Sequence, residues 1–374
     1  MIRPLEQIMT EHFKRIARAD KRNSVSPLAV GIDSLYVSFY LDGIGIDWEQ
    51  LALEKERLLH DRARTHIEIE LGGETFALRR GAGRPFSYAL SSRAFTIQLG
   101  RRVQPNCHVQ FHSELLWSVG LSGAVSRFKA WYSALGAHPT RNEAIARADF
   151  AFDFHTPKPD FSYPNFLSQA DKDSEWRANR ATQTYQFGKD QVVCRVYNKS
   201  AEIEEASDKT WMFDIWGVRE GVWRVEFQVR GERLKATGIS NLAQLSAHAP
   251  RLVRQLATKH TTLRTRTKDS NSSRWPFHPV WNGVLDAADR LATGPMVPMF
   301  ERHGPDDYTK GLQARSVYGA LKGLAATLSA RRVDSPLTFE DTVKLLPRIM
   351  QWHHSDDIWR SDVLEKIRKR GLGL

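Results

Sequence analysis

The sequence of 374 residues contains only two cysteines, Cys107 and Cys194. Two cysteines are too few for a disulfide framework, and their separation does not fit a zinc cluster. No run of 18 or more apolar residues is present, and the first residues lack the apolar centre of a signal peptide. We therefore expect a cytoplasmic protein that has no membrane partner.

Acidic residues are also in deficit. There are 43 Asp and Glu residues against 54 Lys and Arg, which gives a formal net charge of +11. A charge of this sign attracts polyanions at long range, and nucleic acid is the most common of them. Charge alone is equally consistent with a basic enzyme that binds no nucleic acid, so the motifs must decide.

The chain is longer than a single hydrophobic core usually supports, which predicts two domains. Residues 1–24 have an amphipathic, basic pattern that predicts a helical arm, although a solvated helix packed on the body would look the same. Residues 251–274 contain seven Lys or Arg and end in a Ser/Asn/Asp stretch, which predicts a basic linker. We expect a catalytic domain over 25–250 and a helical C-terminal domain over 275–374 that contributes to DNA binding.

Apolar residues alternate with polar ones in several segments of the catalytic domain, and this period of two indicates half-buried strands. The alternation begins near residue 30 and returns around residues 67–71 and 107–111, and further strands are expected at about 145–154, 191–198 and 222–230. Residues 117–135 have helical spacing instead. Strands, then a helix, then strands predict an α+β fold built on an antiparallel sheet.

The last three of these strands each have one charged face. In RADFAFDF the phenylalanines point one way and the carboxylates the other, and the same split occurs in QVVCRVYNK and VWRVEFQVR. If the three strands share a sheet, their polar sides meet. The set that would gather is Arg147, Asp149, Asp153, Arg195, Tyr197, Lys199, Arg224 and Glu226.

This set of side chains is suited to phosphoryl transfer. Carboxylates can hold Mg²⁺ or Mn²⁺, cations can neutralise charge on phosphorus, and Tyr197 can supply a nucleophilic oxygen. The alternative is a solvated sheet face with cross-strand ion pairs, for example between Asp149 and Arg224.

Three segments resemble, in order, the trans-acting rolling-circle replication initiators called Rep_trans, a family that includes relaxases of some integrative conjugative elements. The segments are RADFAFDF, TYQFGKDQVVCRVYNKSAEIE and VWRVEFQVRGERL, and the resemblance extends over about residues 30–282. It implies that Tyr197 of the Y-[ND]-K-x-x-E motif attacks a DNA phosphodiester, with Lys199 and Glu202 at the other motif positions. It also implies that Asp149 and Glu226 hold the metal. Asp153 matches a recurrent acid of the first motif and is predicted as a further metal ligand, and Arg224 matches the arginine before the glutamate and is predicted to act in catalysis on the phosphate. Glu202 is equally consistent with a helix-capping role.

The resemblance predicts an enzyme that nicks one strand at an origin, leaving a 5′-phosphotyrosine and a free 3′-OH that primes a host polymerase. The expected partners are origin duplex and single-stranded DNA, a host helicase and a second copy of the chain. For DNA contacts the sequence offers Arg147, Arg195, Arg264, Arg266 and Lys268. A conjugative relaxase with the same chemistry and a non-catalytic DNA-binding protein are the alternatives.

Overall fold

A computed structural model describes residues 24–291, except 62, 63, 179 and 208, and parts of the C-terminal region, namely 321, 324–325, 327–329, 337–350, 360 and 363. The chain divides into two compact units, Met1–Met299 and Phe300–Leu374. The basic arm predicted for 1–24 lies outside the described residues, apart from its last position.

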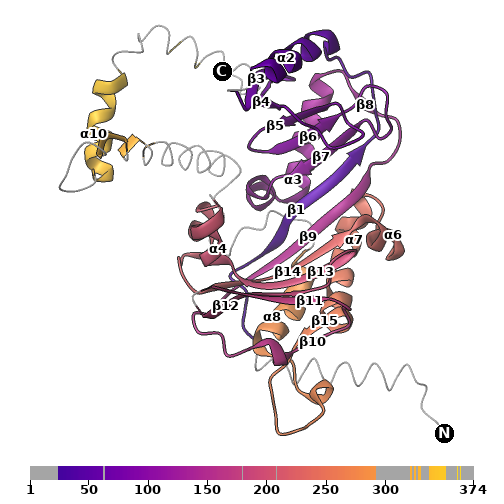
Figure 1. Cartoon of the computed structure of the whole chain (residues 1–374), viewed down its shortest axis with the longest axis vertical. Coiled ribbons are helices and arrows are strands. Elements are labelled where there is room, and N and C mark those ends of the chain that lie inside the picture. Colours follow the sequence, from indigo (N-terminus) through magenta and orange to yellow (C-terminus); the bar gives the residue numbers. More distant parts are fainter. Residues whose placement is uncertain are drawn as a thin grey trace. The chain divides into compact units, whose positions relative to one another are not determined.

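The first unit is an α+β structure, which confirms the predicted fold class, and an 11-stranded antiparallel sheet is its centre (Figure 1). The strands in spatial order are β11 (Asp173–Ala178), β12 (Ala181–Phe187), β13 (Val192–Asn198), β14 (Val222–Arg230), β9 (Ala144–His155), β1 (Ala29–Phe39), β7 (Cys107–Phe111), β6 (Phe95–Leu99), β5 (Tyr88–Ser91), β4 (Glu74–Arg79) and β3 (His66–Leu71). Two short pairs accompany it: β2 (Leu41–Asp42) with β8 (His138–Pro139), and β10 (Phe166–Ser168) with β15 (Thr261–Leu263).

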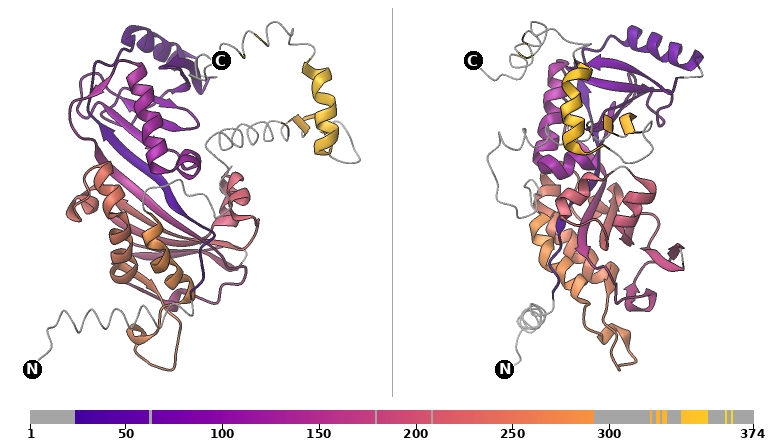
Figure 2. Two further views of the ribbon diagram at one scale, coloured as in Figure 1. Left: turned by 180° about the vertical axis from the view of Figure 1, so that it is seen from behind. Right: turned by 90° about the vertical axis from the view of Figure 1, so that its left-hand side faces the viewer.

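The helices of this unit lie on both sides of the sheet. They are α2 (Trp48–His60), α3 (Ser113–Ala134), α4 (Lys199–Ala206), α5 (Trp211–Trp216), α6 (Gly231–Ala236), α7 (Leu242–Gln255) and α8 (Pro279–Ala287), with the single turns η1 (Tyr163–Asn165), η2 (Leu256–His260), η3 (Ser272–Arg274) and η4 (Ala288–Leu291). Figure 2 shows α3, α7 and α8 on one side of the sheet. The short helices α4 and α5 contribute to a separate, smaller apolar cluster on the other side.

The main core lies between the sheet and the helices α2, α3, α7 and α8. The alternation seen in β9 directs Phe150, Phe152 and Phe154 into this core, where all three are fully buried. On α3, Phe128 packs against Phe39 with a ring-centroid distance of 4.8 Å. Burial of each such ring stabilises the fold by roughly 1.5–3 kcal/mol. The opposite face of the central strands is therefore free to carry polar side chains.

An irregularity in β1 changes which residues face that polar side. Ile32 pairs with Phe150 of β9, but Ser34 pairs with Asp149, so Asp33 is an extra residue in the ladder. Such a bulge shifts the alternation by one position. As a result, both segments of β1 bury their apolar residues, while Asp33 turns toward the charged faces of β9 and β14.

The predicted basic linker over 251–274 is wrong. Its residues form the end of α7, the turn η2, strand β15 and a loop with η3, and all of them belong to the first unit. The basic residues on α7 face solvent, while Leu252, Val253 and Leu263 are buried in the core. The high content of charge therefore marked one face of a core helix rather than a connection between domains.

The predicted domain boundary moves accordingly. Residues 275–291, assigned from the sequence to the C-terminal domain, form α8 and η4 of the first unit, where Trp281 is fully buried. In the second unit, the described residues include the helix α10 (Phe339–Met350). Among the described residues, we find no helix with the length and apolar character needed to span a membrane.

Candidate active site on the polar face of the sheet

The three strands with charged faces are neighbours in the sheet, in the order β13, β14, β9 (Figure 1). Arg224 of β14 pairs with Tyr197 on one side and with Asp153 on the other. Two residues further along β14, Glu226 pairs with Arg195 and with Ala151. Because directly paired residues point to the same side of a sheet, the structure brings the charged faces together.

Tyr197 and Glu226 form the centre of this cluster. The Tyr197 hydroxyl donates a hydrogen bond of 3.1 Å to Oε2 of Glu226. The other carboxylate oxygen of Glu226 accepts a bond of 3.1 Å from Nη1 of Arg195. Arg195 also donates to Gln186 on β12 at 2.9 Å, which fixes the plane of its guanidinium group. Both oxygens of Glu226 are thus held, one by a phenol and one by a cation.

The surroundings of Tyr197 disfavour its phenolate. Shielding from water and the negative charge of Glu226 raise the pKa of Tyr197 well above its ordinary value, against the opposing effect of the Arg224 charge. At neutral pH the hydroxyl is therefore protonated and able to donate to Glu226. Any use of this oxygen as a nucleophile requires removal of the proton as the new bond forms.

Asp149 lies beside this pair, diagonal to Glu226 across the β9–β14 ladder. Its side chain is only 4% exposed, and both of its oxygens accept hydrogen bonds from Arg147, with Nε at 2.8 Å from Oδ1. The pKa of Asp149 is raised to about 6. Burial is the largest cause, the hydrogen bond from Arg147 opposes it, and the charge of Glu226 adds to it. Two carboxylates that repel each other in this way favour binding of a cation between them.

Asp153 and Arg224 have a different environment from the one predicted. Arg224 is completely buried and donates to Asp153 through Nε (2.6 Å) and Nη2 (2.9 Å), and to Asp33 through Nη1 (2.7 Å). The indole N–H of Trp216 donates to Asp153 at 2.9 Å, and that of Trp117 donates to Asp33 at the same distance. We call Asp33, Arg224 and Asp153 the buried triad.

The buried triad corrects two sequence predictions. Asp153 was expected to bind metal, but its oxygens accept hydrogen bonds from Arg224 and Trp216, and both Asp153 and Arg224 are fully buried. The oxygens of Asp149 and Glu226 are also held, but by arginines that are partly exposed and can turn to a bound phosphate. Arg224 was expected to act on the phosphate, but it is likewise fully buried, so it cannot reach a bound strand without rearrangement. Arg224 instead lies directly beside Tyr197 in the sheet, where its charge acts on the phenol.

The YNKxxE motif marks the junction between β13 and α4. Asn198 is the N-cap of α4, and its side chain accepts a hydrogen bond of 3.1 Å from the backbone of Ala201. Lys199 in the first turn forms an ion pair with Glu202, and its ammonium group lies 5.7 Å from the centre of the Tyr197 ring. Burial and the nearby Arg224 charge lower the pKa of Lys199. Glu202 therefore contacts Lys199 and not Tyr197.

Of the predicted DNA-binding residues, Arg147 and Arg195 belong to the cluster and are both partly exposed. Arg264, Arg266 and Lys268 follow β15, which packs on the core side of the sheet. Arg264 stacks on Phe277, with its guanidinium carbon 3.9 Å from the ring centre, while Arg266 and Lys268 are exposed in the loop. These three residues are separate from the Tyr197 cluster.

Asp33 is the residue of this region that the sequence reading missed. The run Ile32-Asp33-Ser34-Leu35 places two polar residues together inside an alternating strand. An interruption of this kind indicates a bulge, and it could have identified Asp33 as a residue of β1 that faces the site.

The residues present are compatible with a divalent ion. Within the described parts of the chain, no group of three or more His, Cys, Asp or Glu side chains is arranged to hold a metal. Asp149 and Glu226 form a pair instead, and proteins often bind Mg²⁺ through one or two carboxylates, with waters and substrate phosphates completing its coordination. Burial is the largest cause of the raised pKa of Asp149 and the charge of Glu226 adds to it, and a bound cation would offset both effects.

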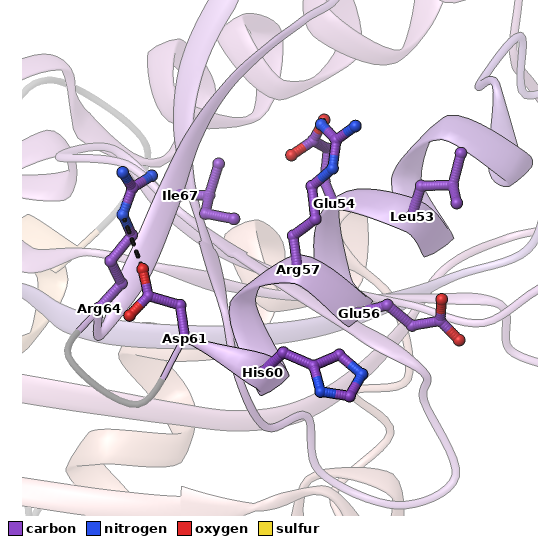
Figure 3. Close-up of a pocket in the computed structure, with 8 residues that line it drawn as sticks. All are labelled: Leu53, Glu54, Glu56, Arg57, His60, Asp61, Arg64 and Ile67. Carbon is purple, nitrogen blue, oxygen red and sulfur yellow. Dashed lines mark hydrogen bonds and ion pairs between the residues drawn. The ribbon is translucent and has the colours of Figure 1, made fainter.

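A pocket of about 620 Å³ lies elsewhere, along α2 and the start of β3 (Figure 3). Its lining includes Leu53, Arg57 and Ile67, and an ion pair of 3.1 Å between Arg64 and Asp61. None of the residues that line it belongs to β9, β13 or β14, so this pocket is separate from the candidate site.

Comparisons with known proteins leave the family open. No protein-family model matches the sequence, and no curated protein matches it. Among solved structures, a rolling circle replication initiator protein from Geobacillus stearothermophilus is similar over 71% of this chain and 97% of its own, with 16% sequence identity and a TM-score of 0.39.

Proposed function

We propose that this protein cleaves one strand of DNA with Tyr197 as the nucleophile, as a replication initiator of the rolling-circle type. The observation that carries the proposal is the hydrogen bond of 3.1 Å between the Tyr197 hydroxyl and Glu226, next to Asp149 and two partly exposed arginines. The formal charge of +11 favours a polyanionic substrate.

In the proposed reaction, Oε2 of Glu226 accepts the proton of Tyr197 as the phenolic oxygen forms a bond to phosphorus. The bond from phosphorus to the 3′ oxygen breaks, and that oxygen takes a proton from water and leaves as a free 3′-OH. The 5′ side of the strand stays on Tyr197 as a phosphotyrosine. Reversal of the same step reseals the strand.

The two arginines of the cluster have a role in this reaction. Arg195 and Arg147 now neutralise Glu226 and Asp149, and a phosphate entering the site offers them a second anion. A guanidinium group binds phosphate through parallel hydrogen bonds, which positions the scissile group and stabilises the charge that develops on it.

Asp149 and Glu226 would hold Mg²⁺ or Mn²⁺ as the proposed cofactor. Such an ion polarises the phosphate oxygen and stabilises the negative charge of the transition state. Asp153 is left out of this ligand set because it belongs to the buried triad.

The biological role that follows is initiation of replication at an origin. The free 3′-OH would prime a host polymerase, and a host helicase would open the duplex ahead of it. Origin duplex and single-stranded DNA are the proposed substrates, and a second copy of the chain is a proposed partner.

Nicking of supercoiled DNA tests the proposal. The protein is incubated with supercoiled DNA from its native element and Mn²⁺, and the products are separated on denaturing gels. We expect nicked circles with the unaltered protein and none with Tyr197→Phe, while both bind the DNA with similar affinity. Binding by both proteins with no nicking by either would favour a non-catalytic DNA-binding protein instead.

A further inference from the structure

An indole ring lies open to solvent at one edge of the sheet. Trp176 on β11 is 49% exposed, and β11 is the last strand on that side. Tryptophan is highly buried on average, because its large ring gains most from leaving water. A single exposed apolar residue often has no special role. Whether Trp176 has one therefore depends on its position relative to the candidate site.

The strand register places Trp176 in line with Tyr197. Trp176 pairs with Thr184 of β12, and Thr184 pairs with Tyr197 of β13. Directly paired residues point to the same face, so the indole and the phenol lie on the same side of the sheet. Neighbouring strands are about 4.8 Å apart, which separates the two backbone positions by about 10 Å.

The surface between the two rings is suited to a polyanion. The row formed by Trp176, Thr184 and Tyr197 has a second row of paired residues beside it on the same face. These residues are uncharged or basic, namely Ser174, Gln186 and Arg195. The acidic residues of β11 alternate to the opposite face, where Asp173 bonds to the Tyr163 hydroxyl. A strand of DNA running from Trp176 to Tyr197 thus meets no carboxylate of β11 or β12 on the way.

We propose that Trp176 is a stacking platform for an unpaired DNA base close to the scissile phosphate. This inference rests on the proposed function and names a contact that holds its substrate. Phosphates in one strand of B-form DNA rise by about 3.4 Å each, so about 10 Å corresponds to about three nucleotides, and to fewer in an extended strand. Every base has an aromatic face, whereas bases in a duplex are already stacked, so the ligand is single-stranded DNA.

Equilibrium binding of a short labelled oligothymidylate, followed by fluorescence anisotropy at one salt concentration, tests the platform. All proteins carry Tyr197→Phe, so that no cleavage occurs and the readout is independent of the chemistry. We expect Trp176→Ala and Trp176→Leu to weaken binding about 5- to 150-fold, the range for loss of one base–aromatic stack. Trp176→Phe keeps an aromatic face and should stay within about threefold of the parent.

Tyr163→Ala is the matched control. Tyr163 is also an exposed aromatic residue, at 38%, but its ring stacks on the core-facing Phe187. Its removal should leave binding of the oligonucleotide unchanged.

Three results would overturn the platform. They are unchanged affinity in Trp176→Leu, equal loss in Trp176→Phe and Trp176→Leu, and a change of oligomeric state in Trp176→Ala with no change in DNA affinity. The last result would assign the ring to a contact between copies through the β11 edge. If the nicking assay fails but the affinity for the oligonucleotide still depends on Trp176, only the proposed chemistry is rejected and the platform stands.

Discussion

Tyr197 and Glu226 are coupled through one proton. The hydroxyl donates to Oε2 of Glu226, and burial together with the charge of Glu226 raises the pKa of Tyr197. In the proposed reaction, the carboxylate that disfavours the phenolate in the resting protein is also the group that would receive its proton. Under this proposal, the same contact would keep the phenol protonated at rest and take up its proton during cleavage.

Substitution of Glu226 by Gln tests this coupling. The amide keeps the shape of the side chain but cannot accept the proton, and it is also a weaker ligand for the proposed cation. General-base catalysis alone contributes about 10²- to 10⁴-fold. Single-turnover nicking by Glu226→Gln should slow by at least that range, while DNA binding stays as tight or becomes tighter, because a negative charge is removed. Nicking within about tenfold of the unaltered rate would contradict the role of Glu226.

Asp149 provides a pH-dependent test. Its pKa is about 6 in the folded protein against an ordinary 3.8, so the fold favours the protonated form. This group's contribution to stability is therefore complete below about pH 4 and is lost as the pH rises through about 6. Carboxyl NMR titration of the metal-free protein should show a midpoint near 6.

Arg147→Met should move that midpoint upward, because the hydrogen bond and charge of Arg147 lower the pKa of Asp149. Arg93→Met, which removes an exposed arginine paired with Glu114, is the control and should leave the midpoint unchanged. A downward shift in Arg147→Met would show that the assigned partner is wrong.

Removal of the central arginine of the buried triad should lower the free energy of unfolding strongly, and more than removal of a partly exposed arginine nearby. Arg224→Met removes the buried cation that Asp33 and Asp153 share, and leaves Asp33 with Lys209 at 3.3 Å as its remaining cation. Loss of one partner of a buried ion pair typically costs about 3–5 kcal/mol. Urea denaturation should show a loss of this size for Arg224→Met and a much smaller loss for Arg195→Met, whose guanidinium group is partly exposed. Equal losses in the two variants would contradict the structural role of the triad.

Among the strands and helices, the β13–α4 junction gives the YNKxxE motif a physical basis. Asn198 ends β13 and caps α4, Lys199 and Glu202 pair across the first turn of that helix, and Tyr197 is the last-but-one residue of β13, on the site face. Asn and Asp are both good N-caps, which agrees with a motif that accepts either at this position.

Removal of the cap should weaken the junction. Asn198→Ala is expected to lower the free energy of unfolding by about 1 kcal/mol, and Asn198→Asp by much less, because aspartate also caps a helix. Thermal denaturation of the two variants measures the difference. Identical stability of the Ala and Asp variants would show that the side-chain bond of 3.1 Å to Ala201 contributes nothing.

Strands with one buried face were predictable from the sequence, since alternation is a local property. The expected strands near 145–154, 191–198 and 222–230 are β9, β13 and β14, and their polar faces meet. The sequence could not show which of the charged residues on these strands would pair with each other. Asp153 and Arg224 pair with each other because they lie in register and are covered by Trp117 and Trp216, which come from distant parts of the chain.

Other elements were missed because their signals are weak or mixed. The strands β4, β5 and β6 are short, and α2 has only two buried residues, Leu51 and Leu58. The buried strand β15 follows a basic helix face, so the whole stretch resembled a linker. Trp176 became significant only once the register of β11 with β12 was known.

Across the whole chain, all residues of the candidate site come from the first unit, Met1–Met299. Five neighbouring strands, β11 to β9, carry the site and the proposed stacking platform on one face, while the large core occupies the other. The candidate site therefore lies on the face of the sheet opposite the main core, and a strand of DNA would need to contact only that face.

Identification of the residue that becomes joined to DNA tests the account most directly. Tyr36 is the natural competitor, because it lies on the same face with the Arg147 guanidinium carbon 5.1 Å from its ring centre. After reaction with origin DNA and Mn²⁺, proteolysis and mass spectrometry should find a 5′-phosphorylated nucleotide on Tyr197, absent in Tyr197→Phe and retained in Tyr36→Phe. A nucleotide on Tyr36 or on any other residue, or DNA nicking that persists in Tyr197→Phe, would contradict it.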